Sequence, residues 1–192
     1  MKRLLLLTLI AGFGLSLIQA QTTWKVDKVH SSVTFTVNHM VISEVTGNFK
    51  DYSIDISTTK DDFSDAKVES IIKVASINPE NTARDNHLRS DDFFNAEKYP
   101  EITFKNAYFH HIEGNKYHIT GDLTIRDVTK KVTFDAVCNG TIKTPKGFLS
   151  AWKATAVINR FDFNLKWSQV METGGLMVGK EVTITLNLEL NK

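Results

Sequence analysis

The residues of this chain that could carry acid–base chemistry are concentrated in one short segment. They are Arg84, Asp85, His87 and Arg89. A histidine beside a carboxylate is a common general base, and Ser31 or Ser90 could complete a Ser-His-Asp triad on paper. However, the chain lacks the Gly-x-Ser-x-Gly sequence that presents the serine of many hydrolases. A hydrolase or isomerase that uses the Arg84–His87 region is therefore kept as an alternative, and no catalytic residue is predicted.

A structural role suits the same segment better. Charged side chains beside a short helix can satisfy backbone groups that would otherwise be buried without a partner. We expect the segment to tie this part of the chain to one rim of the fold, or to contact the polar head group of a ligand. His30 and His39, at the two ends of the first strand pattern, are expected to make hydrogen bonds there.

The histidines and the cysteine of the chain do not form a metal-binding pattern. A zinc site needs three or four converging ligands, and none of the spacings among the six histidines matches a zinc motif. His110 and His111 are adjacent, so in a strand they point to opposite faces. Cys138 is the only cysteine and has no partner for a disulfide or a redox pair. We predict no metal and no cofactor.

The first twenty residues have a composition of their own. Met1-Lys2-Arg3 is followed by an apolar run to Ile18 and by a small residue at Ala20, which is the layout of a secretory signal peptide. The apolar run is about 15 residues long, shorter than the roughly 20 that a membrane crossing needs. We expect residues 1–20 to be removed on export to the periplasm, and residues 21–192 to form a single domain.

The charge of the chain gives no indication of a nucleic-acid partner. The formal net charge is +1, and it becomes −1 when the two basic residues of the signal peptide are removed. Proteins that bind nucleic acid normally carry a basic excess. Nucleic acid is therefore excluded as an expected partner.

Nearly every segment after residue 30 alternates apolar and polar residues with a period of two, which predicts β-strands. In the segment 182–190, for example, every second residue from Val182 to Leu190 is apolar and the residues between them are polar. One dry and one wet face are typical of antiparallel sheets, because parallel sheets are covered on both sides. Turn-forming residues separate the segments at 113–115, 126–127, 139–140 and 145–147. About eight antiparallel strands are expected.

Residues 78–98 lack this alternation. Asn78-Pro79 is a typical helix start, and Ser90 followed by two aspartates resembles a second N-cap. We expect one or two short helices near residues 79–96, in a crossover between two strands.

A sheet of this size has to close into a barrel or split into a sandwich, because an open sheet leaves unpaired edges. An eight-stranded barrel is just wide enough to be filled by its own side chains or to hold one ligand. The inward faces are apolar, so a ligand would be long and apolar, and each buried methylene would contribute roughly 0.8 kcal/mol. The alternation alone leaves a ligand cavity and a solid core equally open.

Several longer stretches have a distinctive sequence. They are Trp24–His39, Val45–Phe49, Ala75–Asn78, Arg84–Phe94, Tyr99–Phe104, Gly121–Lys130 and Asn159–Phe163. Together they resemble the YceI-like family, the lipocalin-like, polyisoprenoid-binding proteins of the bacterial periplasm, over essentially all of residues 21–192. Asp127 and Asn164 stand where the family usually has glycine, and both residue types tolerate a positive φ.

The resemblance implies an all-β fold, an eight-stranded antiparallel lipocalin-like barrel whose channel binds an isoprenoid chain of the quinone or polyprenyl type. It implies no catalytic residues, and it does not identify the lipid. The inward-facing apolar residues of the strand patterns are the candidates for lining the channel. They are Val33, Phe35, Val37, Phe49, Ile72, Val74, Ile102, Phe104, Ile119, Leu123, Ile125, Val132, Phe134, Val157, Phe161, Phe163, Ile184 and Leu186.

Further expectations concern the surroundings of the barrel. Residues 164–180, rich in glycine and methionine, are expected to form a lid or rim at one end. A carried lipid needs a membrane or a membrane protein as its donor and acceptor. The outer apolar residues of segments 67–77 and 149–158 would be the surface of a homodimer. A ligand-free stress or adhesion module with a solid core is the second alternative to a lipid carrier.

Overall fold

The structure is a computed structural model that describes residues 21–172 and 174–192. The predicted signal peptide, residues 1–20, lies outside the described residues. Eleven strands of the described chain form one sheet. None of the described helices has the length and apolar character that a membrane crossing requires.

The strands follow the alternating segments of the sequence, because each strand turns one apolar face inward. They are β1 (Thr22–Val26), β2 (Ser32–His39), β3 (Ser43–Phe49), β4 (Tyr52–Thr58), β5 (Lys67–Lys73), β6 (Ile77–Asn78), β7 (Glu101–Glu113), β8 (Lys116–Ile125), β9 (Val128–Thr144), β10 (Gly147–Asn159) and β11 (Val178–Asn191). The helices are α1 (Thr82–Arg89) and the 3-10 turns η1 (Val74–Ser76) and η2 (Arg160–Phe163).

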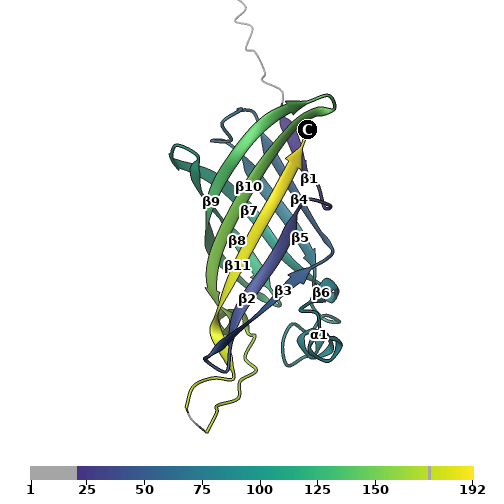
Figure 1. Ribbon diagram of the computed structural model, residues 1–192, viewed down its shortest axis with the longest axis vertical. Coiled ribbons are helices and arrows are strands. Elements are labelled where there is room, and N and C mark those ends of the chain that lie inside the picture. The colour runs from purple at the N-terminus through teal and green to yellow at the C-terminus, as the bar shows by residue number, and fades with distance from the viewer. Residues whose placement is uncertain (1–20, 173) are drawn as a thin grey trace, which may run out of the picture.

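Strand β11 closes the sheet into a barrel, because it pairs with β10 on one side and with β1 on the other. The ring runs β1-β4-β5-β7-β8-β9-β10-β11, every neighbouring pair is antiparallel, and Lys25 and Val26 pair with Asn191 and Leu190 to complete it. Eight strands therefore form a closed antiparallel barrel (Figure 1), which confirms the predicted fold class.

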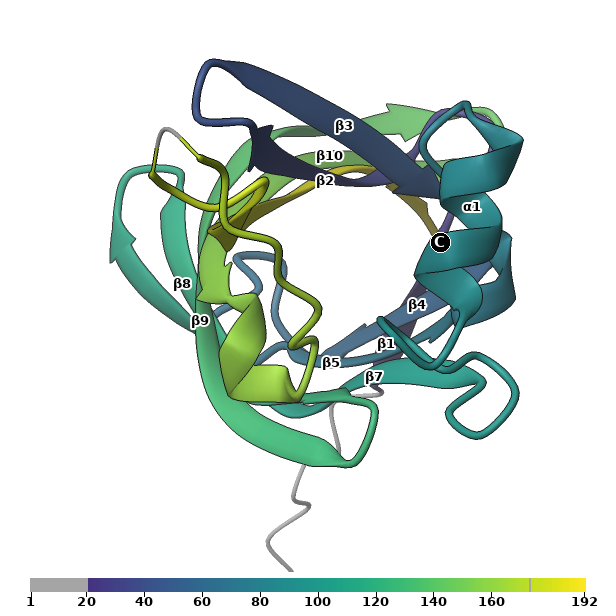
Figure 2. The same ribbon diagram turned by 90° about the horizontal axis from the view of Figure 1, so that it is seen from below.

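Three more strands extend the wall at the lower end of Figure 1. Strand β11 has 14 residues and β1 has 5, so the part of β11 from Val178 to Asn187 pairs with β2 instead. Strand β3 pairs with β2, and the short β6 pairs with the end of β3. The first barrel strand is thus interrupted at residues 27–31, and α1 follows β6 at the rim of this end (Figure 2).

One of the predicted turns is wrong. Asn139-Gly140 does not end a hairpin, since β9 runs through it to Thr144. Gly140 has φ +146°, and the pairing with β10 shifts by one residue between Ala151 and Trp152. A β-bulge therefore absorbs the two turn-type residues, and the strands continue past it.

The crossover contains one α-helix, and it begins later than the sequence indicated. The side chain of Asn78 accepts a hydrogen bond from the Glu80 amide, and Glu80 has φ +60°, so the chain turns before the helix starts. Asn81 is the N-cap of α1, and its side chain accepts from the Arg84 amide at 3.0 Å. Ser90 does not start a second helix, because its hydroxyl donates back to the His87 carbonyl at 2.7 Å and closes the first.

The two departures from the usual family glycines behave differently. Asn164 has φ +60°, as its residue type allows. In the turn between β8 and β9 the positive φ falls on Arg126 (φ +54°) and not on Asp127. That turn directs the Arg126 guanidinium to the Phe93 carbonyl at 2.7 Å, so the turn is tied to the segment that follows α1.

Candidate functional site

Aromatic side chains fill one end of the barrel, the end that is uppermost in Figure 1 and includes the turn between β7 and β8. They are Trp24, Phe63, Phe109, Tyr117 and Trp152, and all are buried. The Trp152 ring lies 5.0 Å from the Phe63 ring and 5.1 Å from the Tyr117 ring, in edge-on and tilted contacts of the kind that aromatic pairs prefer. The Trp152 indole donates to the Ser150 hydroxyl at 2.8 Å. We call these five residues the aromatic plug, since they leave this end of the barrel solid.

Phe63 reaches the plug from a loop, not from a strand. It has φ +57°, which is rare for an aromatic residue and turns its ring into the barrel end. Asp65 holds the same loop, because its carboxylate accepts hydrogen bonds from the Thr58 and Thr59 hydroxyls and from the Thr59 amide. These hydrogen bonds hold the pKa of Asp65 well below its ordinary value.

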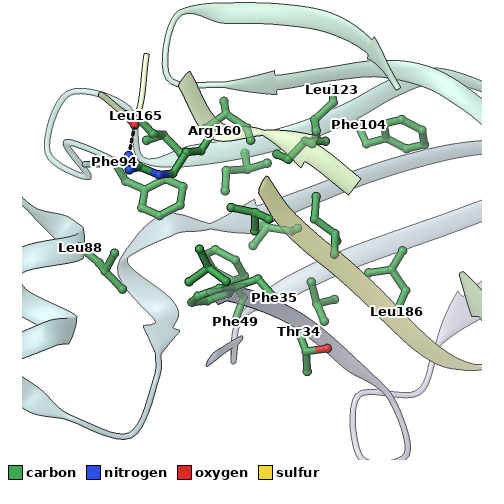
Figure 3. Close-up of a pocket in the computed structure, with 18 of the residues that line it drawn as sticks. Thr34, Phe35, Phe49, Leu88, Phe94, Phe104, Leu123, Arg160, Leu165 and Leu186 are labelled. Atoms are coloured by element: carbon green, nitrogen blue, oxygen red, sulfur yellow. Dashed lines mark hydrogen bonds between the residues drawn. The ribbon is translucent and has the colours of Figure 1, made fainter. Parts of the chain in front are cut away.

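Below the plug lies an apolar cavity of about 140 Å³. Most of the channel candidates named from the sequence line it. They are Val33, Phe35, Val37, Phe49, Ile72, Ile102, Phe104, Leu123, Ile125, Phe134, Ile184 and Leu186. Figure 3 shows these side chains converging from opposite walls, with Phe35 and Phe49 facing Leu123 and Phe104 across the space. The barrel is therefore hollow below its plug.

Two further spaces adjoin this central cavity. Toward the plug, a space of about 40 Å³ is lined by Ile119 and Trp152 and shares Phe104 and Leu186 with the central wall. Toward the rim, a space of about 350 Å³ shares Phe35 and other wall residues with it. The three spaces share wall residues and decrease in volume from the rim toward the plug, so together they form an apolar tunnel whose mouth lies at the rim.

Five of the named candidates lie outside these spaces. Val157 is on the outer face of β10 and 61% exposed, because the inward residues of this strand are its even-numbered ones, from Trp152 to Ile158. The segment has small or apolar residues on both faces, so the alternation did not decide its orientation. Of the other four, Val74 in η1, Val132 on β9 and Phe163 in η2 pack in or against the hydrophobic core. Phe161 in η2 is partly buried, with the Arg160 guanidinium 4.3 Å from its ring centroid.

Several lining residues were missed because they come from segments without alternation. They include Leu88 of α1, Phe93 and Phe94 after it, Leu165 of the segment before β11, and Val178, the first residue of β11. They line the central cavity on the side of the mouth, as Figure 3 shows for Leu88, Phe94 and Leu165. The pair Phe93-Phe94 in an otherwise polar crossover is the one sequence signal that could have indicated this.

The mouth collects three of the polar residues named from the sequence. His39, Arg84 and His87 line it together with Trp167 and Met177. The His87 ring lies edge-on to Phe93 at 5.0 Å and to Trp167 at 5.3 Å, and its Nε2 lies 3.0 Å from Asp92 Oδ2. The mouth therefore combines aromatic faces with a few polar groups.

The remaining charges of this segment hold the backbone. Arg89 donates to the carbonyls of Ala75 and Ile77, both at 3.0 Å, and Arg84 donates to the Pro79 carbonyl at 2.8 Å. Asp85 is buried within α1, and its carboxylate lies 3.9 Å from the Arg89 guanidinium. These contacts fit the expected tie between the helix and the barrel rim.

The triads considered on paper are not assembled. The Ser90 hydroxyl is bound to a backbone carbonyl, and Ser31 Oγ accepts a hydrogen bond from the Glu189 amide at 2.8 Å. In the described part of the chain, the hydrogen bonds of the histidine rings go to Asp27, Asp92 and the Gly114 carbonyl.

His30 lies away from the mouth, in the interruption between β1 and β2. Its Nδ1 lies 3.1 Å from Asp27 Oδ2 and 3.6 Å from Glu189 Oε1. The hydrogen bond raises the pKa of the exposed His30 ring and lowers the pKa of Asp27. This group pins the place where β11 changes its partner from β1 to β2.

Arg160 is the one buried charge beside the central cavity among the described residues. Its guanidinium donates to four backbone carbonyls, at 2.6 to 2.9 Å. They are those of Leu165, Trp167, Val178 and Gly179. Burial lowers the pKa of Arg160. Leu165 and Trp167 lie in the segment that Figure 2 shows crossing the mouth, and Val178 and Gly179 begin β11. Arg160 therefore fastens both ends of the predicted rim to the end of β10.

Comparison with known proteins agrees with this architecture. Residues 24–190 match the family model described as YceI-like domain. A UPF0312 protein of Staphylococcus aureus strain N315 is 36% identical over an alignment of 172 residues, which covers 88% of this chain and 98% of the relative.

Two solved structures are similar to the barrel. A YCEI protein of Campylobacter jejuni is 36% identical, with a TM-score of 0.70 over 81% of this chain and 89% of that one. A polyisoprenoid binding domain of Saccharophagus degradans, at 14% identity, covers 88% of this chain and 97% of that one with a TM-score of 0.61, which shows a likeness of fold. With a matching family model over nearly all of the described residues, the chain belongs to the YceI-like domain family.

Proposed function

We propose that the barrel binds the apolar chain of a lipid, an isoprenoid chain of the quinone or polyprenyl type, and carries or stores it in the periplasm. The observation that carries this proposal is the apolar tunnel, which is sealed at the plug and open at the mouth. Its walls are aliphatic and aromatic side chains, and Arg160, the charge beside it, already has backbone carbonyls as partners.

The shape of the tunnel indicates how such a ligand would lie. A lipid has to enter with its chain first, because the plug blocks the far end. Its polar head then lies at the mouth, near His39, Arg84 and His87. Each methylene that leaves water contributes roughly 0.8 kcal/mol, so a chain of a dozen carbons would offset the cost of association.

The choice of an isoprenoid rests on similarity. The related fold from Saccharophagus degradans is described as a polyisoprenoid binding domain. The proposed location rests on residues 1–20, whose sequence has the layout of a signal peptide. A carrier is favoured over a hydrolase because the polar atoms of Arg84, Arg89 and Ser90 are engaged with backbone carbonyls.

Mass spectrometry of organic extracts from the purified native protein tests the proposal. We expect about one isoprenoid lipid per barrel, and uptake of a quinone or polyprenol by the stripped protein. Leu186→Trp places a large ring in the central cavity and should abolish both. Val157→Trp, on the outer face of the neighbouring strand, is the matched control and should behave like the wild type.

Two outcomes would contradict the proposal. A clean extract together with no uptake of quinone or polyprenol would leave the cavity without this function. A stoichiometric fatty acid or phospholipid in place of an isoprenoid would retain lipid binding and reject the isoprenoid.

A further inference from the structure

The hairpin between β2 and β3 presents three consecutive apolar residues to solvent. Met40, Val41 and Ile42 are 42%, 64% and 90% exposed. Met40 and Val41 have φ of +52° and +68°, in the region that hairpin turns usually fill with asparagine or glycine. A β-branched valine is unfavourable in this conformation, so local turn chemistry does not explain these residues.

Another exposed apolar side chain lies in the segment beside this hairpin. Val170 is 69% exposed, in the segment that Arg160 fastens across the mouth. The Met40 amide donates to the Met177 carbonyl at 2.8 Å, and a Cβ built on Gly175 would lie 3.0 Å from Val41 Cγ2. Figures 1 and 2 show the two segments side by side at the end of the molecule. We call the side chains of Met40, Val41, Ile42 and Val170 the rim ridge.

The rim ridge is continuous with the mouth of the tunnel. Asn38 and His39 directly precede Met40 in the chain, and they line the mouth together with Met177, whose carbonyl accepts from the Met40 amide. The exposed apolar tip of the protein therefore lies directly beside the opening of the cavity.

The opposite end of the barrel has polar tips instead. Its connections are Lys60-Asp61-Asp62, Gly114-Asn115 and Pro145-Lys146. Ile112, Ile142 and Phe148 are 44%, 60% and 40% exposed at that end, but each lies on a strand (β7, β9 or β10) beside a polar turn and not at the tip. Exposed apolar residues therefore occupy the loop tips at the open end of the barrel, whereas the loop tips at the plugged end are polar.

We infer that the rim ridge inserts into the surface of a lipid bilayer and holds the mouth of the tunnel against it. The inference rests on the proposed function, because a ligand with a long apolar chain has to leave and enter a membrane through that mouth. Separate protruding side chains suit insertion among lipids, where burial of apolar area drives binding.

The charges around the ridge specify the kind of membrane surface. Segments 39–44 and 164–181 carry two lysines against three glutamates. Without a basic excess, attraction to anionic head groups contributes little. The predicted partner is therefore a bilayer recognised by its apolar interior, and binding should be nearly independent of salt.

Co-sedimentation of the purified protein with phosphatidylcholine vesicles tests the inference. We expect the wild type to bind at low and high salt. Ile42→Asp combined with Val170→Asp should weaken vesicle binding about tenfold or more, since each 1.4 kcal/mol is a factor of ten. Ile142→Asp changes an isoleucine of similar type and exposure at the plugged end, and should leave binding unchanged.

A second measurement does not depend on a loss of binding. Ile42→Trp places a fluorophore at the most exposed ridge position, and its emission should shift to the blue when vesicles are added. Vesicle binding by the double aspartate variant at wild-type strength, or lipid uptake that requires a membrane protein, would overturn the inference. Uptake of quinone from detergent solution tests the proposed function separately, and the double aspartate variant should retain this uptake. If the wild-type protein takes up no quinone from detergent but still binds vesicles, the proposed function is rejected and the membrane inference is not.

Discussion

The two ends of the barrel are built from the same strands and have opposite interiors. At the upper end, rings from β1, β7, β8 and β10 meet Phe63 and fill the cross-section. At the lower end, aliphatic residues of β2 and β11 face the aromatic side chains of other walls across open space. Strand geometry is therefore not what makes the cavity. Side-chain size and the contributions of loops decide which part of an eight-stranded barrel is solid.

The two ends of the barrel should differ most in how much the free energy of unfolding falls when a side chain is truncated. Trp152→Ala removes a ring that contacts three others in the plug, and we expect a loss of about 3–5 kcal/mol in the free energy of unfolding. Ile184→Ala, beside the cavity, should cost about 2 kcal/mol, because its neighbours already lack contacts on one side. Urea unfolding measures both. Equal losses would mean that the lower end packs as well as the plug.

A smaller difference in the free energy of unfolding is expected between the two ends when a side chain is enlarged. Ala136→Phe has no space to occupy, since Ala136 is buried and pairs with Tyr117 and Ala154, and should cost about 1–3 kcal/mol. Ile184→Phe extends into the central cavity and should stay within about 1 kcal/mol of the wild type. The same urea titrations, combined with lipid uptake, separate the two sites. A large loss for Ile184→Phe would contradict a hollow lower end.

The smallest effect concerns the loop that supplies Phe63. Because the folded-state pKa of Asp65 is lowered, its stabilising contribution is present above the unfolded pKa near 3.8 and is lost as the pH falls through the folded value. Asp65→Asn should therefore lower the melting temperature at pH 7, and the difference from the wild type should shrink below about pH 4. Lipid uptake at the mouth should not change. A difference that is the same at pH 3 and pH 7 would exclude this electrostatic contribution.

The strands and the inward residues on them could be predicted from the sequence wherever one face alone was apolar. Phe35, Leu123 and Ile184 are in the cavity wall because a period of two leaves no other way to bury them. The inward residues could not be predicted where both faces of a segment were apolar. Val157 belongs to a segment with small or apolar residues on both faces, and Asn139-Gly140 are turn residues whose strands still had paired partners beyond them.

Tertiary structure alone decided the interior and its closure. No local pattern places Phe63 in the plug, because its left-handed backbone is held by the loop around Asp65. Nor does any pattern connect Arg160 with four carbonyls of the segment that follows it. By itself the alternation determined an all-β, antiparallel sheet with one apolar face, because alternation is a local property of the chain, and the family resemblance implied that this sheet closes into a barrel. Whether the inner faces pack together or enclose a cavity depends on contacts between residues distant in sequence. The folded barrel shows that they pack together at the plug and enclose a cavity toward the mouth.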